Sequence, residues 1–426
     1  MITAHATTTR APSVPSVVPA SCLSFSFFAL CFSLFFFLLL PLPALAQTEP
    51  YTFRSAHYEI TTDLPRDQAR AIARHMDRVY AEYDRRFGAF ASRGPRQSPL
   101  RICADRDGYL EYLTSEGING AGSGGMFYHQ GMKAGLVVDA SAGEQRMLHT
   151  LQHEGFHQFA HMRIGETIPP WANEGLAEYF GRMMDLRGRF LTGLVDERTL
   201  RAVQRAAEQR RHFPFDELLS MTGQQWSDRL RAGDPRAGLQ YAQSWLVVHF
   251  LINARGGRYA GMFLEYLKAM SRGMRHAEAF RTAFGTDDIR SFEAAWLDYI
   301  AGLEPDAVTT GLQRIEFLGA GLKFLHERAI RPATIEDLKT ELRARSFTIQ
   351  TTGHGAPEEL SADDDAWFQP PAPERPNPRQ PAEFVLLPAA GDDLPPAIEL
   401  RGLRASLTLT FQRDDAGRLT STTSIR

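Results

Sequence analysis

The stretch LQHEGFHQFAHMR, at residues 151–163, places His153 and His157 four positions apart, with Glu154 directly after the first of them. In an α-helix, side chains four positions apart project from the same face on successive turns, so both imidazoles can reach one ion. Glu154 points away from that axis but can reach the open side of a bound metal, where a water would sit. The neighbouring residues are largely apolar, and unpaired imidazoles among them would be costly. The spacing therefore predicts a metal-binding helix over residues 143–162.

A second pattern follows at residues 169–180, PPWANEGLAEYF, where two prolines stand at a position that suits the first turn of a helix. Glu174 and Glu178 lie four apart on one face of this helix. A catalytic zinc takes three protein ligands and keeps one position open, and two histidines with one glutamate form a known set. We therefore predict that Zn²⁺ is bound by His153, His157 and Glu174. Glu178 is then placed to accept a hydrogen bond from the far nitrogen of a ligand histidine.

Two more histidines, His149 and His161, continue the four-residue spacing along the first helix. A straight helix cannot bring side chains from four turns to one ion. We therefore interpret both as surface or packing residues outside the metal site, and His161 as a neighbour of the loop that leads to the second helix.

Patterns on either side of these two helices predict an α+β fold. An amphipathic pattern predicts a helix from Pro65 to Gly88, and nearly every segment between residues 170 and 303 is helical in character. We expect a small mixed N-terminal sheet that carries the active-site helix, followed by a mainly helical half, all in one domain at residues 47–305. Strands are expected at residues 57–63, 100–105, 126–129 and 135–139.

The chain changes in character after residue 305. A helix is expected near residues 335–345, and the proline-rich stretch QPPAPERPNPRQPAEF, at residues 369–384, is typical of a linker. The last residues favour a β-hairpin. We therefore divide this part into a helix and linker region, residues 306–384, and a C-terminal β segment, residues 385–426.

The first 46 residues have the pattern of a secretory signal peptide. An apolar, uncharged run at residues 22–46 ends in ALA before Gln47, which is the A-x-A form of a cleavage site. The protein is therefore expected to be exported, and to be periplasmic, secreted or associated with the cell envelope. An uncleaved N-terminal membrane anchor is the alternative, because the run is close to the roughly 20 residues that span a bilayer. No later stretch approaches that length, so we expect no membrane span after cleavage.

The charge and cysteine content limit the classes of partner. The full chain has 47 basic and 50 acidic residues, and removal of the signal peptide would take away one basic residue, Arg10. The mature chain would therefore have a net charge of −4. This balance argues against nucleic acid or anionic lipid as the main partner. Cys103 is the one cysteine that follows the signal peptide, and a single thiol cannot form an internal disulfide. The exported domain must therefore be stabilised by its core or by a metal.

The motifs LQHEGFHQF and IPPWANEGLAEYF resemble those of the gluzincin metallopeptidases, the clan of thermolysin and the zinc aminopeptidases. They most resemble the peptidase MA-like domains of exported bacterial proteins, a largely uncharacterised family, and the likeness covers about residues 55–300. It implies that His153, His157 and Glu174 bind zinc and that Glu154 is the general base. It also implies that Glu178 accepts a hydrogen bond from a ligand histidine without binding zinc itself. The gap of 17 residues between His157 and Glu174 is shorter than in thermolysin.

A donor to the developing oxyanion is also expected in a peptidase. Tyr241 and His249, in YAQSWLVVHF at residues 241–250, are two candidates that lie near one face of a helix. The resemblance favours Tyr241, because gluzincins often use a downstream tyrosine. The segment GGMFYHQ, at residues 124–130, is expected to be an edge strand along which a peptide can pair, with Tyr128 either touching substrate or serving as an ordinary strand residue.

The sequence thus predicts an exported zinc-dependent metallopeptidase, an enzyme that hydrolyses peptide bonds in a peptide or protein substrate with Glu154 as general base. One alternative is a zinc-bearing scaffold that has lost turnover. Another is a metal-free interaction module of the cell envelope, in which the histidines are incidental. The sequence indicates neither the substrate nor the oligomeric state.

Overall fold

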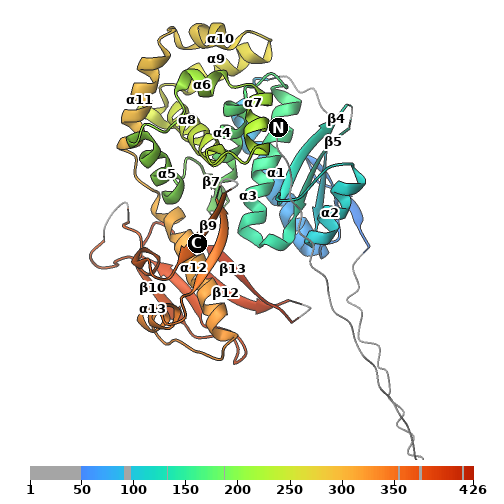
Figure 1. Cartoon of the computed structure of the whole chain (residues 1–426). Coiled ribbons are helices and arrows are strands. Elements are labelled where there is room, and N and C mark those ends of the chain that lie inside the picture. The colour runs from blue at the N-terminus through green and yellow to red at the C-terminus, as the bar shows by residue number, and fades with distance from the viewer. Residues whose placement is uncertain are drawn as a thin grey trace, which may run out of the picture. The chain divides into compact units, whose positions relative to one another are not determined.

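The N-terminal part of the chain is built on a five-stranded sheet. In the computed structural model its strands are β1 (Tyr51–Arg54), β2 (Tyr58–Thr62), β3 (Ser98–Cys103), β4 (Gly125–Gln130) and β5 (Lys133–Asp139). The strand order is β1-β2-β3-β5-β4, and Figure 1 shows β4 and β5 side by side. The three central strands run parallel, whereas β1 and β4 pair antiparallel at the two edges. The sheet is therefore mixed, and β4 is one of its open edges.

The structure describes residues 49–90, 97–131, 133–186, 188–353, 356–373, 377–414 and 417–426. The predicted signal peptide, residues 1–46, lies outside them. Among the described residues, no helix combines the length and the apolar character needed to cross a lipid bilayer.

Helices cover both faces of the sheet. The helices α1 (Arg66–Phe87) and α3 (Glu144–Arg163) pack on one face, and α2 (Arg106–Ser115) packs on the other. Successive strand side chains point to opposite faces, so Val138 of β5 joins the core under α1 and α3 while Val137 joins the smaller core under α2. The metal-binding helix predicted from sequence is α3, which is thus fixed on a rigid sheet.

The helical half begins with α4 (Pro170–Gly181), which packs along α8 (Ala237–Gly257). The expected α+β class is confirmed, with a small N-terminal sheet followed by mainly helical structure. The remaining elements of this half are the short strands β6 (Met184–Leu186) and β7 (Arg189–Leu191) and the helices α5 (Glu197–Glu208), α6 (Phe215–Ser220), α7 (Gly223–Arg231), α9 (Ala260–Ser271), α10 (His276–Phe284) and α11 (Ile289–Ala301).

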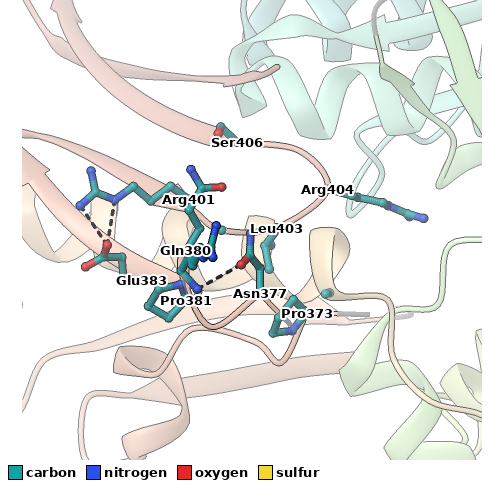
Figure 2. A pocket seen from close by; sticks show the side chains of 12 residues that line it. Pro373, Asn377, Gln380, Pro381, Glu383, Arg401, Leu403, Arg404 and Ser406 are labelled. Atoms are coloured by element: carbon teal, nitrogen blue, oxygen red, sulfur yellow. Dashed lines mark hydrogen bonds and ion pairs between the residues drawn. The ribbon is translucent and has the colours of Figure 1, made fainter. Parts of the chain in front are cut away.

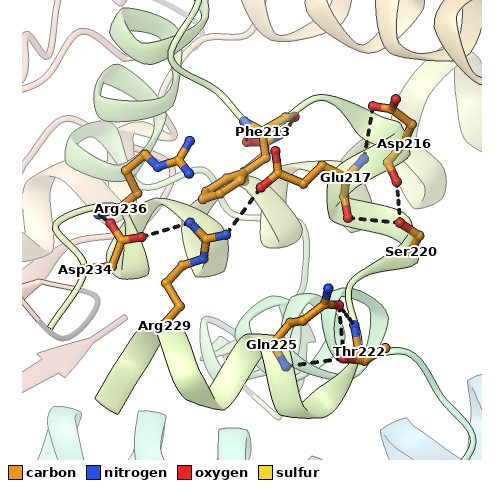
Figure 3. A network of polar contacts seen from close by, with 10 residues as sticks. Phe213, Asp216, Glu217, Ser220, Thr222, Gln225, Arg229, Asp234 and Arg236 are labelled. Atoms are coloured by element: carbon orange, nitrogen blue, oxygen red, sulfur yellow. Dashed lines mark hydrogen bonds and ion pairs between the residues drawn. The ribbon is translucent and has the colours of Figure 1, made fainter. Parts of the chain in front are cut away.

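A polar network holds α7 beside α6 (Figure 3). Arg229 of α7 pairs with Glu217 at 3.3 Å and with Asp234 at 2.9 Å. The guanidinium groups of Arg229 and Arg236 both lie over the ring of Phe213, at 4.8 Å and 4.5 Å from its centroid. These contacts fix α7, which carries Trp226, and Nε1 of Trp226 donates to the hydroxyl of Tyr241 on α8.

The C-terminal part has a hydrophobic cluster of its own. The helices α12 (Ala307–His326) and α13 (Ile335–Arg343) pack with a four-stranded antiparallel sheet of order β10-β11-β12-β13. The strands of this part are β8 (Thr348–Gly353), β9 (Ala356–Ser361), β10 (Glu383–Leu387), β11 (Ala397–Arg401), β12 (Leu407–Arg413) and β13 (Leu419–Ile425).

The predicted boundary between a linker region at residues 306–384 and a β segment at residues 385–426 is not seen in this packing, because residues of both regions share one hydrophobic cluster. The helix α12, which sequence patterns did not predict, lies against β11 and β12 in the same cluster as α13. The glycines of α12 made it hard to predict, because glycine has a low helix propensity. A Cβ at Gly311 would lie 2.4 Å from Leu400, and one at Gly319 would lie 2.5 Å from Leu409. The glycines are thus required for close packing of the helix on the sheet.

Candidate metal centre

The candidate site is built by two consecutive helices, α3 and α4, which pack against each other. Pro169 precedes α4 and Pro170 occupies its first position, as their fixed φ favours. The buried side chain of Gln152 joins the two helices, because its Nε2 donates to the carbonyl oxygens of Gly181 at 2.9 Å and Met183 at 3.1 Å. The loop between the helices therefore returns the chain so that Glu174 faces α3.

The three predicted ligand atoms lie together. Nε2 of His153 and Nε2 of His157 are 3.2 Å apart, and Oε2 of Glu174 lies 3.5 Å from the first and 3.4 Å from the second. In tetrahedral zinc sites, ligand bonds of about 2.0–2.2 Å put neighbouring ligand atoms about 3.3–3.6 Å apart. The side chains are only 13%, 12% and 18% exposed. The residues present thus fit a zinc ion in both chemistry and spacing.

The same residues form a charged cluster in the absence of metal. Burial by itself lowers the pKa of His157, but the adjacent Glu174 carboxylate raises it to about 9. Burial by itself raises the pKa of Glu174, but His157 and His153 lower it to about 2. The metal-free site therefore holds an imidazolium beside a carboxylate at neutral pH, and a metal ion has to displace a proton to bind.

Glu178 lies behind the first histidine. Its Oε1 is 3.5 Å from Nδ1 of His153, somewhat longer than a hydrogen bond. Glu178 is buried and forms an ion pair with Arg182, which directly follows α4. The Arg182 guanidinium in turn lies over the ring of Trp245, 4.4 Å from its centroid. This chain of contacts fixes the carboxylate on the side of His153 that faces away from Glu174.

Glu154 is held differently from the other acidic residues. Its Oε2 accepts a hydrogen bond of 2.8 Å from the backbone N–H of Phe127, on the edge strand β4. The register of β4 on β5 explains why this N–H is available. The carbonyl oxygen of Gly124 accepts a hydrogen bond from the N–H of Asp139, and in an antiparallel pair the backbone groups of successive residues alternate in direction. The N–H of Phe127 therefore points away from β5. The carboxylate thus stands between the histidines of α3 and the open edge of the sheet.

The structure distinguishes the two candidate oxyanion donors. Burial raises the pKa of Tyr241 well above its usual value, and the negative charges of Glu174 and Glu154 add to this effect. His249 instead bonds through its ring nitrogens to the carbonyl of Gly193 at 3.1 Å and to the hydroxyl of Tyr299 at 2.8 Å. It is a buried core residue, so Tyr241 is the candidate that the site retains.

Several residues of the site escaped sequence reasoning. Arg182 had a usable signal, since it follows Glu178 by four residues on one helix face. Trp226 of α7 had none: its Nε1 lies 3.3 Å from Oη of Tyr241 and donates to it, a contact that only the tertiary fold creates. The N–H of Phe127 is likewise a product of the sheet register.

Two other features lie apart from this cluster. Tyr128 is 7% exposed and pairs with the hydroxyl of Tyr112 at 2.7 Å, so it is the ordinary strand residue of the two options considered. A cavity of about 770 Å³ lies in the C-terminal part, around Arg401 and Gln380, and its described lining includes none of the predicted site residues (Figure 2).

Part of the chain matches a known family. Residues 147–273 match the model of an uncharacterised family described as "Protein of unknown function (DUF1570)". The matched segment includes α4, α8 and nearly all of α3, so His153, Glu154, His157, Glu174, Glu178 and Tyr241 all fall inside it. No curated protein matches the chain. The gluzincin resemblance therefore stays a prediction, and the chain contains a DUF1570 domain at residues 147–273.

Proposed function

We propose that this protein is an exported zinc-dependent peptidase. The observation that carries the proposal is the spacing of the three ligand atoms of His153, His157 and Glu174, which lie 3.2–3.5 Å from one another in a largely buried cluster. A set of two imidazoles and one carboxylate leaves an open position, which is the arrangement of catalytic rather than structural zinc sites.

Zinc bound at this position would make a water more acidic and polarise the carbonyl of a scissile peptide bond. Glu154 lies next to the predicted ligand His153, and its carboxylate accepts one hydrogen bond, at Oε2, so it can take the proton of the attacking water and pass it to the leaving amine. Tyr241 keeps its proton, because burial and nearby carboxylates raise its pKa. Its hydroxyl can therefore donate to the oxygen on which negative charge develops.

The edge strand β4 supplies a place for the substrate backbone. The outward-facing N–H of Phe127 already binds a carboxylate oxygen, and Gly125 and His129 share its orientation by alternation. A peptide that adds to this edge by β-augmentation would run past Glu154 and the ligand histidines. The substrate class that fits is an extended segment of a peptide or protein.

The test compares the wild-type protein with Glu154→Gln. Both are loaded with zinc, and the cleavage of a mixed peptide library is followed with and without a chelator. We expect the wild-type protein to cleave peptides, the chelator to stop it, and Glu154→Gln to retain zinc while its turnover falls by about 10²-fold or more, the scale of a lost general base.

The variant Glu174→Gln is the matched comparison, because it makes the same chemical change at a ligand. It replaces an anionic ligand with a weak neutral one, so both zinc content and activity should fall. If Glu154→Gln loses zinc and Glu174→Gln keeps it, the two roles are reversed. If the zinc-loaded wild-type protein cleaves no peptide, the peptidase proposal fails and the zinc-bearing scaffold is the remaining interpretation.

A further inference from the structure

A second group of metal-binding side chains lies beside the candidate metal centre and shares no residue with it. The group comprises His129 at the end of β4, His161 in the last turn of α3, and Glu166 in the loop that leads to α4. Each side chain offers one ligand atom, and the three atoms lie within 4.8 Å of one another. The contact of His161 with this loop agrees with the position expected from sequence, whereas His129 and Glu166 gave no sequence signal.

In this group one nitrogen of each histidine faces the same carboxylate oxygen. Nδ1 of His129 and Nδ1 of His161 both lie near Oε1 of Glu166, at 3.8 Å and 3.6 Å. These separations exceed the usual N–H···O hydrogen bond of about 2.7–3.2 Å. They are closer to the separation of about 3.3–3.6 Å between two atoms that bind the same zinc ion. The two imidazole rings also stack, with centroids 4.8 Å apart.

We propose that His129, His161 and Glu166 form a second, exchangeable site for a divalent transition metal such as Zn²⁺. Two imidazoles and one carboxylate suit zinc, nickel or copper, whereas calcium and magnesium require mainly oxygen ligands. Three protein ligands leave the remaining coordination positions to water. Small rotations of these side chains are enough to bring all three ligand atoms onto one ion.

The second site binds metal more weakly than the first. Its side chains are 48%, 28% and 67% exposed for His129, His161 and Glu166, whereas the ligands of the first site are 18% exposed or less. Exposed side chains lose rotamer freedom when a metal orders them, and this loss opposes binding. The second equivalent of metal therefore exchanges while the first is retained.

The second site lies where a bound metal would hold the end of the edge strand β4. His161 lies one helical turn after His157, and His129 lies two residues after Phe127, whose N–H binds Glu154. An ion held by all three side chains would join the end of β4 to the end of α3 and to the loop before α4. Metal binding itself does not depend on the proposed peptidase activity. An effect on peptide pairing along β4 does rest on that proposal.

The experiment is a calorimetric titration of the full chain with Zn²⁺ after it has been loaded with one equivalent. The test variants are His129→Gln, His161→Gln and Glu166→Gln. The matched control is His326→Gln, which makes the same change at the end of α12. We expect a second equivalent in the wild-type protein and in the control. We expect its affinity to fall at least tenfold in each of the three variants. Glu166→Gln alters an exposed loop side chain, so its result does not depend on the folding of a histidine variant.

A second measurement separates the two sites. In His157→Ala the tightly bound zinc should be lost, while the weaker equivalent remains and still depends on Glu166. The proposal is overturned if the wild-type protein binds one equivalent only, or if the second equivalent has the same affinity in all three variants. Neither result would alter the peptidase proposal, which is tested by cleavage and by Glu154→Gln.

Discussion

Tyr241 lies on a third helix, α8, and its hydroxyl oxygen accepts a hydrogen bond from Nε1 of Trp226 at 3.3 Å. Because the oxygen is held as an acceptor, the hydroxyl proton is free to point elsewhere, and in the proposed mechanism it would donate to the developing oxyanion. The tryptophan is thus a positioning residue, which acts through the tyrosine and not on the substrate.

We expect Tyr241→Phe to lower kcat by about 10²-fold, the scale measured for the loss of one oxyanion donor, and to leave zinc content unchanged. Trp226→Phe removes the hydrogen bond of about 1 kcal/mol that holds the tyrosine, so kcat should fall about fivefold. Steady-state kinetics on a cleaved peptide, with metal analysis of each variant, measures both effects. Equal kcat in Tyr241→Phe and the wild-type protein would remove this tyrosine from the mechanism.

The raised pKa of His157 has a measurable consequence for zinc binding. Its pKa is raised to about 9 beside Glu174, so the metal-free protein carries this proton at pH 7, and zinc has to displace it. We expect zinc binding to release about one proton at pH 7, and the release to fall as pH rises through 9. Calorimetry in buffers of different ionisation enthalpy measures the number of protons. A release that is the same at pH 7 and pH 9.5 would contradict the raised pKa of His157.

At the scale of the elements, the packing of α4 on α8 depends on one glycine. A Cβ at Gly175 would lie 2.5 Å from the carbonyl oxygen of Ser244 and 2.7 Å from Val248. No other side chain fits between these helices without moving the backbone. Since Gly175 directly follows Glu174, the close approach of the two helices also sets the position of a predicted zinc ligand.

We therefore expect Gly175→Ala to destabilise the fold by about 1–3 kcal/mol, as overpacked cores do, and to weaken zinc binding. The matched control is Gly261→Ala on α9, where a Cβ would meet nothing within 4 Å and alanine favours helix. Thermal unfolding and zinc titration of both variants provide the measurement. If Gly175→Ala is as stable as Gly261→Ala, the helix contact is looser than the structure indicates.

Elements with strong periodicity were predictable from the sequence, and so was the grouping of His153, His157 and Glu174, while the binding of zinc by them stays a prediction. The amphipathic pattern after Pro65 gave α1 almost to the residue, and the two four-residue spacings placed these three side chains on α3 and α4. Glycine-containing α12 and the short strands β6 and β7 were missed, because tertiary packing overrides weak local propensity there. Contacts between distant segments, such as Trp226 with Tyr241, have no local pattern at all.

At the scale of the whole molecule, the chain has two main hydrophobic clusters that are separate in sequence. The larger one is formed by residues between Tyr58 and Ile300, and a second one by residues after Val308. Polar contacts join the two parts, among them Arg314 with Glu197 at 2.9 Å and the N–H of Asp306 with the carbonyl of Val195 at 2.9 Å. Met184 and Leu186 of β6 also pack against the second cluster.

We expect a chain that ends at residue 305 to fold and to bind zinc, because it keeps the whole of the larger cluster and all three ligand residues. Its stability should be lower than that of the full chain, since Met184 and Leu186 lose their apolar neighbours. Zinc content and thermal unfolding of a chain of residues 47–305 give the answer. Insoluble protein, or protein without zinc, would mean that the first part requires the second to fold.

The return of the chain between α3 and α4 also bears on the order in which the protein folds. All three predicted zinc ligands lie within residues 153–174, on neighbouring helices, so bringing them together closes only a short loop and loses little chain entropy. The ligands can therefore meet before α8 has been synthesised. A metal that binds at this stage contributes its binding free energy to the first folded unit. In refolding from denaturant, zinc is thus expected to increase the rate at which the chain folds, measurable by stopped-flow fluorescence, and not only its final stability.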